Sequence, residues 1–259
     1  MLIAIDIGNT NSSFGLFRDD LDTPITTWRA SSVRERTSDE WAVFLHSWLA
    51  ETRTDPAHID GFAVSSVSPM IDAAIAPLGQ RLFHQPTLMV SLALDLGIQV
   101  TVEIPAEMGS DRLVNAAEAF RRFGGPLIVV DMGTATKIEA INAQGDFLGG
   151  VIAPGLALSL ESLASKAARL FTVPLALAPH AIATNTIHAV QAGVVNGHLA
   201  MIEGMVARVR VELGGADRVV LTGGHSHAIA TSSAIFTDFL PDLTLEGIAQ
   251  IYRRNRLAG

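Results

Sequence analysis

Residues 2–17 read LIAIDIGNTNSSFGLF, and residues 127–141 read LIVVDMGTATKIEAI. Each stretch begins with an apolar run that is typical of a strand buried on both faces. The run ends in a carboxylate, Asp6 in the first stretch and Asp131 in the second, and a glycine follows two residues later. A second β-prone run comes after the glycine. The pattern predicts a strand–turn–strand unit that occurs twice in the chain.

The predicted turns consist of small residues with neutral hydrogen-bonding groups. Gly8 and Gly133 permit positive φ and the close approach of a ligand to the backbone. Backbone N–H groups and short polar side chains can together hold a phosphate, and the strand-end carboxylate can hold a cation that neutralises it. The short polar residues are Asn9, Thr10, Asn11, Ser12 and Ser13 in the first copy, and Thr134 and Thr136 in the second.

A single D-x-G turn also occurs in ordinary hairpins, so either copy alone favours that simpler interpretation. Two copies about half a chain apart favour two halves of duplicated topology. We therefore expect the two hairpins to face one cleft.

Composition sets the outer limits of the prediction. The chain has 259 residues, of which 49% are hydrophobic and 17% charged, so there is ample material for a core. The formal net charge of −8 argues against a nucleic-acid-binding protein. The absence of cysteine fits a reducing cytoplasm. We expect no signal peptide, because the first apolar run carries Asp6 and lacks a basic lead, and no membrane span.

Hydrophobic periodicity predicts alternating strands and helices. Ser38 is expected to cap the first helix, and the long apolar helix at 185–213 is expected to be buried between the halves or against a second chain. The expected strands are 2–7, 13–17, 25–30, 59–67, 87–90, 127–131, 134–141, 145–151 and 217–221, and the expected helices are 38–51, one opened by Pro69, 107–123, 156–170, 185–213 and 243–252.

Two further sites carry candidate chemistry. Asp111 and Arg112 stand at the first turn of the helix 107–123, where Asp111 is either a helix cap or a general base, and Arg112 is either a surface residue or an anion ligand. Gly223 and Gly224 follow the strand 217–221 and suit a nucleobase or ribose lying against the backbone, although an ordinary turn would also contain them.

These features together are typical of a two-lobed nucleotide phosphotransferase. The sequence lacks G-x-x-x-x-G-K-[ST], so it is not a P-loop enzyme. It also lacks G-x-G-x-x-G after a strand, which argues against a dinucleotide oxidoreductase.

The sequence resembles the type III pantothenate kinases of the acetate and sugar kinase/Hsc70/actin superfamily. The matching motifs run in family order across nearly the whole chain. They are DIGNTN (6–11), SSVSP (65–69), GSDRLVNA (109–116), DMGTAT (131–136), GGVIAPG (149–155), NT (185–186), QAG (191–193), TGG (222–224) and PDLTLEG (241–247).

The resemblance implies an α/β fold with two RNase H-like (actin-like ATPase) lobes, residues 1–123 and 124–259, and a nucleotide cleft between them. It implies ATP-dependent phosphorylation of the primary hydroxyl of pantothenate to 4'-phosphopantothenate, the first step of coenzyme A biosynthesis. It also implies a cytoplasmic homodimer with the acceptor pocket at the subunit interface.

The resemblance assigns roles to the matching positions. Residues 6–13 and Thr134 would bind ATP, with Mg²⁺ at Asp6. Asp131 would hold a monovalent cation, K⁺ or NH₄⁺. Asp111 would take the proton from pantothenate, which Gly109, Ser110, Asp111 and Arg112 would hold, with Thr186 contributed by the partner subunit.

Two positions depart from the family pattern. The family usually has a Tyr lining the pantothenate pocket where this chain has Val102, and a Thr where this chain has Lys137. An ammonium close to Asp131 could replace the monovalent cation, whereas a Lys137 on the other face of its strand would point to solvent.

These departures leave two alternatives to pantothenate phosphorylation. One is a small-molecule kinase of the same fold with a changed acceptor. The other is a non-catalytic nucleotide-binding regulatory protein, against which the joint presence of Asp6, Asp111, Arg112 and Asp131 counts.

Overall fold

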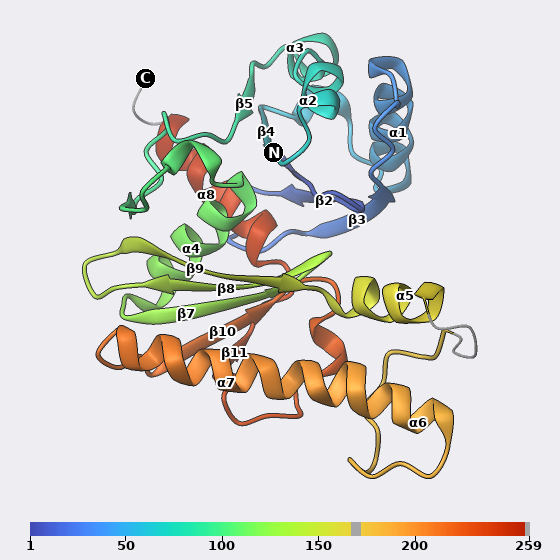
Figure 1. Cartoon of the computed structure of the whole chain (residues 1–259). Coiled ribbons are helices and arrows are strands. Elements are labelled where there is room, and N and C mark those ends of the chain that lie inside the picture. Colours follow the sequence, from blue (N-terminus) through green and yellow to red (C-terminus); the bar gives the residue numbers. More distant parts are fainter. Residues whose placement is uncertain (167–171, 257–259) are drawn as a thin grey trace. The chain divides into compact units, whose positions relative to one another are not determined.

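The computed structural model describes residues 1–166 and 172–256 (Figure 1). The chain forms two compact units, each with its own β-sheet. The first contains Met1–Gln99, Glu103–Arg121 and Asp242–Gly259, and the second contains Val100–Val102 and Arg122–Pro241. The predicted helix 156–170 is observed as α5 (Leu156–Lys166), and its predicted last residues lie outside the described part of the chain.

The sheet of the first unit has the strand order β3-β2-β1-β4-β5. The first three strands form an antiparallel meander, as predicted, whereas β4 and β5 run parallel to β1. The polar ends of β1 and β4 therefore lie at the same edge of the sheet. The strands are β1 (Leu2–Ile7), β2 (Asn11–Phe17), β3 (Thr26–Ser31), β4 (Gly61–Ser66) and β5 (Thr87–Met89).

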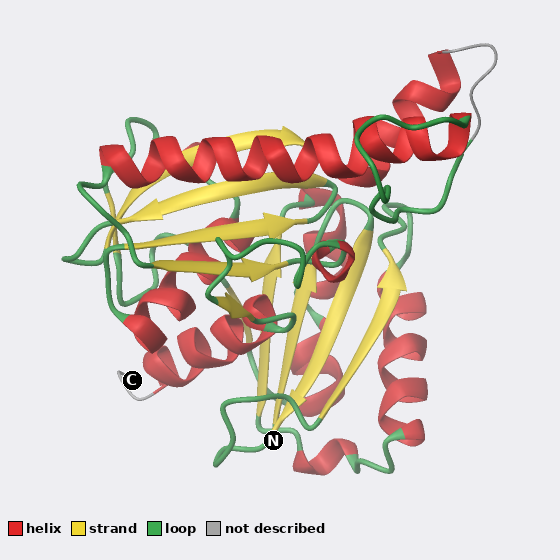
Figure 2. Cartoon of the chain, turned by 90° about the horizontal axis from the view of Figure 1, so that it is seen from below, coloured by secondary structure: helices red, strands yellow, loops and turns green. Residues whose placement is uncertain are grey.

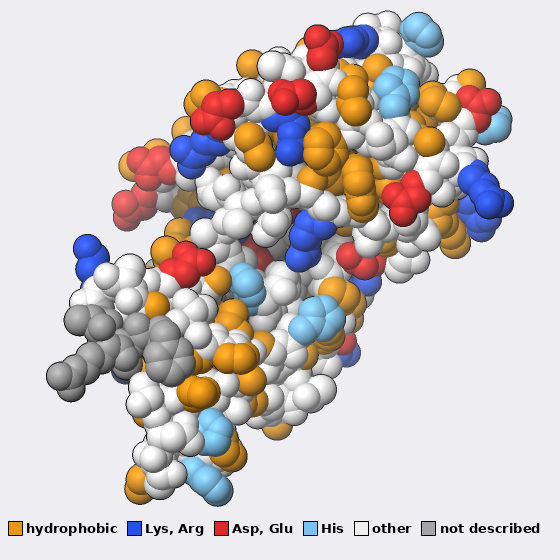
Figure 3. All heavy atoms as spheres, turned by 90° about the vertical axis from the view of Figure 1, so that its right-hand side faces the viewer, with side chains coloured by type: hydrophobic (Ala, Val, Ile, Leu, Met, Phe, Trp, Pro, Cys, Tyr) orange, Lys and Arg blue, Asp and Glu red, His pale blue; other side chains and the backbone are white. Residues whose placement is uncertain are grey.

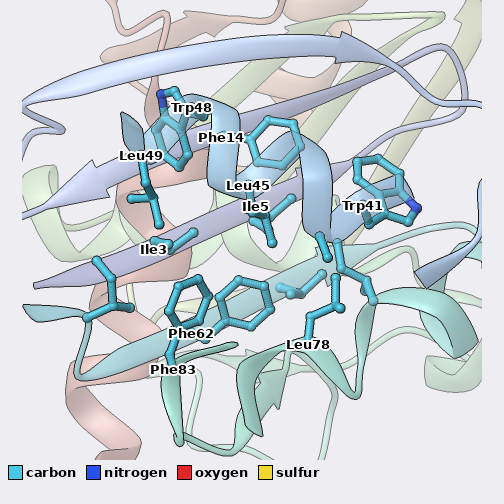
Figure 4. Packing of buried hydrophobic residues seen from close by; sticks show 14 of the residues in the cluster. Ile3, Ile5, Phe14, Trp41, Leu45, Trp48, Leu49, Phe62, Leu78 and Phe83 are labelled. Carbon is cyan, nitrogen blue, oxygen red and sulfur yellow. The ribbon is translucent and has the colours of Figure 1, made fainter. Parts of the chain in front are cut away.

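An aromatic-rich core fills the first unit on one side of this sheet (Figure 4). Phe14 of β2 lies with its ring centroid 6.0 Å from Trp41 and 5.8 Å from Trp48, both on α1. The side chains shown in Figure 4 come from strands and helices far apart in sequence, so this core holds the meander against the helices. The helices and 3-10 turns of the unit are α1 (Ser38–Glu51), η1 (Pro56–His58), α2 (Pro69–Ile75), α3 (Leu78–Phe83), η2 (Pro105–Glu107), α4 (Ser110–Phe123) and α8 (Leu243–Arg256).

The last helix belongs to the first unit, although it lies at the end of the sequence. The Tyr252 hydroxyl of α8 donates to the backbone oxygen of Asp60, at 2.9 Å. Gly61 makes this packing possible, because a Cβ there would lie 2.6 Å from the Tyr252 ring. The predicted division into residues 1–123 and 124–259 therefore differs from the compact units after Pro241, and also at Val100–Val102 and residues 122–123. A continuous split could not anticipate that the chain returns to its first sheet.

The second sheet repeats the arrangement of the first. Its order is β11-β10-β7-β8-β9-β6, with an antiparallel meander from β7 to β9 and with β10 and β11 parallel to β7. The duplicated topology predicted from the two hairpins is confirmed. The strands are β6 (Gln99–Val100), β7 (Leu127–Met132), β8 (Ala135–Ile141), β9 (Asp146–Pro154), β10 (Arg218–Thr222) and β11 (Asp238–Phe239).

The long apolar helix predicted at 185–213 covers this second sheet (Figures 1 and 2). It consists of α6 (Thr186–Gln191), a π-helical turn (Ala192–Asn196) and α7 (Gly197–Glu212). Its apolar side chains pack with β7 and β8 in the core of the second unit. Most of the apolar surface of this helix, which was expected to be buried between the halves or against a second chain, is therefore buried within its own unit. Val211 is one apolar side chain of α7 that stays exposed.

Among the helices of the described residues, none combines the length and the hydrophobicity that crossing a lipid bilayer requires.

The cap of α1 differs from the prediction. The helix begins at Ser38, and the residue before it, Thr37, is the N-cap. The Thr37 hydroxyl accepts a hydrogen bond from the Glu40 backbone N–H at 3.3 Å, and the Glu40 carboxylate accepts one from the Thr37 backbone N–H at 2.7 Å. This reciprocal capping box satisfies two backbone donors that the helix cannot pair internally. Both Thr37 and Ser38 fit the sequence pattern, and only the backbone conformation selects Thr37.

We predict that Thr37→Ala lowers the free energy of unfolding by about 1 kcal/mol, because the hydroxyl acceptor of the capping box is lost. Ser38→Ala is the matched control and is expected to change it little. The measurement is urea denaturation followed by tryptophan fluorescence, since Trp41 and Trp48 lie on this helix. Equal losses for the two variants would contradict the assignment of the cap.

Candidate active site

The first hairpin joins β1 and β2 through a tight turn with exposed polar side chains. The backbone N–H of Gly8 donates to the oxygen of Asn11 at 3.1 Å, which closes the turn. Asn9, Thr10 and Asn11 are exposed. Asp6 is half-buried at the base of the turn and is paired across the sheet with Ser13. The turn thus presents amide and hydroxyl groups beside one carboxylate.

Ser12 differs from the other turn residues, because its side chain is fully buried. Its hydroxyl is 2.8 Å from the hydroxyl of Ser32, which follows β3. This contact holds the base of the hairpin to the next strand. Although Ser12 was predicted to bind phosphate, its hydroxyl has a structural contact at the edge of the hairpin.

The start of α4 is attached to the end of β4 by serine hydroxyls. Ser110 Oγ donates to the oxygen of Ser66 at 2.9 Å and accepts from the Ser66 N–H at 3.0 Å, and it lies 2.9 Å from Ser65 Oγ. Ser65 is in turn the parallel partner of Asp6 on β1. The strand register therefore brings the first turn of α4 close to the first hairpin. The two serines that end β4 therefore position a helix.

Asp111 follows this anchor, and its carboxylate folds back over Gly109. Oδ1 accepts a hydrogen bond from the Arg112 backbone N–H at 2.9 Å. A Cβ at residue 109 would lie 2.6 Å from that oxygen, so glycine leaves room for the carboxylate in this position. The Arg112 guanidinium lies 3.4 Å from the sulfur of Met108. Both charged side chains are half-buried at the start of the helix.

The second hairpin joins β7 and β8 through a shorter turn. The backbone N–H of Gly133 donates to the oxygen of Ala135 at 3.0 Å, and Thr134 at the tip is exposed. Gly155 packs against this turn. A Cβ at residue 155 would lie 2.5 Å from the backbone oxygens of Gly133 and Thr134, so this close packing requires glycine. The exposed Thr134 stands where Asn9 to Asn11 stand in the first copy.

Lys137 contacts Asp131, so the solvent-facing alternative is wrong. The two residues are direct partners across the antiparallel β7–β8 pair, and such partners project from the same face of the sheet. Lys137 Nζ donates to Asp131 Oδ2 at 2.8 Å, and each side chain is only 13% exposed.

The glycine pair after β10, Gly223 and Gly224, borders the Asp131 carboxylate. A Cβ at Gly223 would lie 2.5 Å from Asp131 Oδ1, and Gly223 has a φ of +96°, which favours glycine. Gly224 is exposed. The pair leads into the short 3-10 turn η4 (Ser226–Ala228). Gly223 is therefore required by its contact with Asp131, and the exposed Gly224 is the member that a ligand could approach.

The two remaining predicted residues lie in the second unit. Val102 is half-buried and lies beside Gly149 of β9. A Cβ added to Gly149 would be 3.7 Å from Cγ1 of Val102. Thr186 is exposed at the first position of α6, immediately after the N-cap Asn185, whose side chain accepts from the His188 N–H at 2.8 Å. Their roles in the acceptor pocket stay predictions.

The structure adds a contact that the sequence analysis missed. His198 of α7 is buried, and its Nε2 lies 2.8 Å from the hydroxyl of Thr136, the buried threonine of the second motif. Burial lowers the pKa of His198, which favours the neutral ring as the partner of a hydroxyl. A histidine among the buried positions of an apolar helix was the available signal.

Each unit thus brings together part of the predicted site. The first gathers the hairpin 6–13 and the start of α4, and the second gathers Asp131, Lys137, Gly223 and the turn at Thr134. In both, the carboxylate-bearing strand lies between a hairpin partner and a parallel strand. The parallel partner of the carboxylate is Ser65 in one sheet and Thr222 in the other.

Solved structures with a similar fold span nearly the whole chain. A Campylobacter jejuni protein described as a Baf family transcriptional activator has a TM-score of 0.63, with 19% identity over 99% of this chain and 100% of its own. The activator of 2-hydroxyisocaproyl-CoA dehydratase from Clostridium difficile has a TM-score of 0.53, with 13% identity over 99% of this chain and 96% of its own. These likenesses support the predicted α/β fold with two lobes.

Sequence comparison is more specific. The profile of the type III pantothenate kinase family matches residues 2–208. A protein named type III pantothenate kinase from Roseiflexus castenholzii is 43% identical over 99% of this chain and 100% of its own length. One of the same name from Phenylobacterium zucineum is 41% identical over 99% of both chains. The chain therefore belongs to the type III pantothenate kinase family.

Proposed function

We propose that this chain transfers the γ-phosphoryl group of ATP to the primary hydroxyl of pantothenate. The product is 4'-phosphopantothenate, at the first step of coenzyme A biosynthesis. The observation that carries the proposal is full-length membership of the family together with the fixed position of Asp111, which a nucleotide sensor would not need. This also weighs against the regulatory alternative.

Asp111 is the proposed general base. Its carboxylate takes the proton of the pantothenate hydroxyl while that oxygen attacks the γ-phosphorus of ATP. The new P–O bond forms as the bond to the β,γ-bridging oxygen breaks, and ADP leaves. Ser110 supports this step indirectly, because its hydroxyl is bonded to Ser66 and holds the first turn of α4 in place. Phosphoryl transfer depends mainly on such positioning and on charge neutralisation.

The first hairpin is the proposed phosphate site. Backbone N–H groups and the exposed side chains of Asn9, Thr10 and Asn11 supply donors, and Thr134 and the Gly223–Gly224 turn are the ATP contacts proposed within the second unit. Asp6 is the proposed Mg²⁺ ligand. Protein-bound Mg²⁺ often has one or two carboxylates and otherwise phosphates and water, so a single carboxylate beside a phosphate turn fits it. When bound, the ion neutralises charge on the transferred phosphoryl group.

The start of α4 is also the proposed acceptor site. Arg112 carries the charge that suits the carboxylate of pantothenate, and Gly109 leaves the surface above the helix free of a side chain. Ser110 is better assigned to positioning than to direct substrate contact, since its side chain is buried and bonded to β4. Val102 in place of the family's Tyr keeps a changed acceptor as the alternative, which product analysis with a panel of pantothenate-like alcohols would test.

The monovalent cation expected at Asp131 does not fit the residues present. The Lys137 ammonium already lies 2.8 Å from Oδ2 of that carboxylate. We therefore assign no K⁺ or NH₄⁺ to the proposed mechanism. The proposed location is the cytoplasm, which the cysteine-free sequence and the use of ATP support.

We predict that Asp111→Asn lowers kcat by roughly a hundredfold or more, because the amide keeps the size of the carboxylate but cannot accept the proton. ATP affinity, measured by calorimetry, should change little. Asp217→Asn is the matched control, since Asp217 is exposed in the second unit. The assay is direct detection of phosphopantothenate by ³¹P NMR. Parent-like turnover of Asp111→Asn would reduce Asp111 to a structural residue of the helix.

We also predict a homodimer in solution. Exposed apolar side chains on β9, α5 and α6 support an interface there, including Ile152, Leu158 and Ile187. Figure 3 shows the side of the molecule on which α5 and α6 lie, with hydrophobic side chains at the surface. In the proposal, Thr186 from a second copy completes the acceptor pocket. Sedimentation velocity at assay concentration is the measurement, and a fully active monomer would contradict it.

A further inference from the structure

We infer that Lys137 supplies, as a fixed part of the chain, the positive charge that a bound monovalent cation would supply at Asp131, so that this enzyme works without K⁺. The inference deepens the proposed function and rests on it, since the expectation of a cation comes from the family to which the chain belongs.

The first support is the geometry of the pair. Nζ of Lys137 is 2.8 Å from Oδ2 of Asp131, a normal length for a charge-assisted hydrogen bond. The residues are direct partners in the β7–β8 register, so the sheet itself puts them on one face. The contact does not depend on two long side chains meeting at a surface.

The second support is the burial of the Asp131 and Lys137 side chains. Both side chains are 13% exposed, so water compensates little of either charge and each needs the other. The remaining oxygen, Oδ1, is bordered by the backbone at Gly223, where even a Cβ would come within 2.5 Å. A second cation on this carboxylate would be crowded on one side and repelled by the ammonium on the other.

The third support is a comparison within the chain. Asp6 has the same place in the first hairpin, and its cross-strand partner is Ser13, a neutral residue. In both copies the carboxylate-bearing strand lies between its hairpin partner and a parallel strand, but the residue opposite the carboxylate differs. A lysine can imitate a monovalent ion because its ammonium is a compact point charge on a flexible stem. The second hairpin alone therefore has a built-in cation on its own neighbouring strand.

The test measures the initial rate of phosphopantothenate formation against KCl, with choline chloride keeping the ionic strength constant. The assay is direct, because coupling enzymes can themselves require K⁺. The parent rate should change less than about twofold, since screening is held constant and the Lys137 ammonium already lies at Asp131. Lys137→Thr should be slow without K⁺ and activated about tenfold or more by it, because the buried carboxylate has lost its partner. A parent enzyme strongly activated by K⁺ would overturn the inference.

Lys166→Thr is the matched control. Lys137 and Lys166 are the two lysines of the sequence, and Lys166 is exposed at the end of α5. This variant should remain as independent of K⁺ as the parent. Should Lys137→Thr fail to fold, Lys137→Met keeps most of the apolar stem without the charge and takes its place. A K⁺-independent, fully active Lys137→Met would also overturn the inference.

A second readout does not depend on catalysis. The midpoint of thermal unfolding is compared in KCl and in choline chloride, without substrates. An ion that binds the folded state alone raises the midpoint by mass action, so K⁺ should stabilise Lys137→Thr and leave the parent unchanged. K⁺ stabilisation of the parent would overturn the inference. This separates the two proposals: absence of phosphopantothenate at every salt concentration sinks the proposed function, whereas the unfolding data still decide the role of Lys137.

Discussion

Hydrogen bonding along both edges of one apolar strand is the constraint on which each unit depends. β1 pairs with antiparallel β2 on one side and parallel β4 on the other, and β7 pairs in the same way with β8 and β10. A strand in that position is buried along its length, so polar chemistry is confined to its end. Asp6 and Asp131 stand there, and the pairing brings a tight turn and the end of a parallel strand to each carboxylate.

The same framework makes the difference between the two copies informative. In the first sheet the carboxylate has a serine opposite it, whereas in the second it has a lysine. The side chain on the hairpin partner strand is therefore neutral beside Asp6 and positively charged beside Asp131. A carboxylate enclosed by a glycine turn and a sheet needs a cation nearby, and Lys137 provides one without recruitment from solution.

The start of α4 shows how neighbouring residues of one motif divide the work. Gly109 provides room, Ser110 attaches the helix to β4, and Asp111 presents the carboxylate. From the sequence all three were assigned to substrate binding, because a motif shows that residues act together but not which of them faces a ligand. Burial and hydrogen bonding make that distinction, and they favour a positioning role for Ser110.

The sequence by itself determined the duplicated hairpins, most of the strands and helices, and the motifs that indicate the family. These features are local, because periodicity and turn residues act within a few positions of each other. The tertiary structure decided which of Thr37 and Ser38 caps α1, that α8 returns to the first sheet, and that Lys137 faces Asp131. Those outcomes depend on backbone conformation, on packing between distant segments and on strand register across a turn, none of which a local pattern fixes.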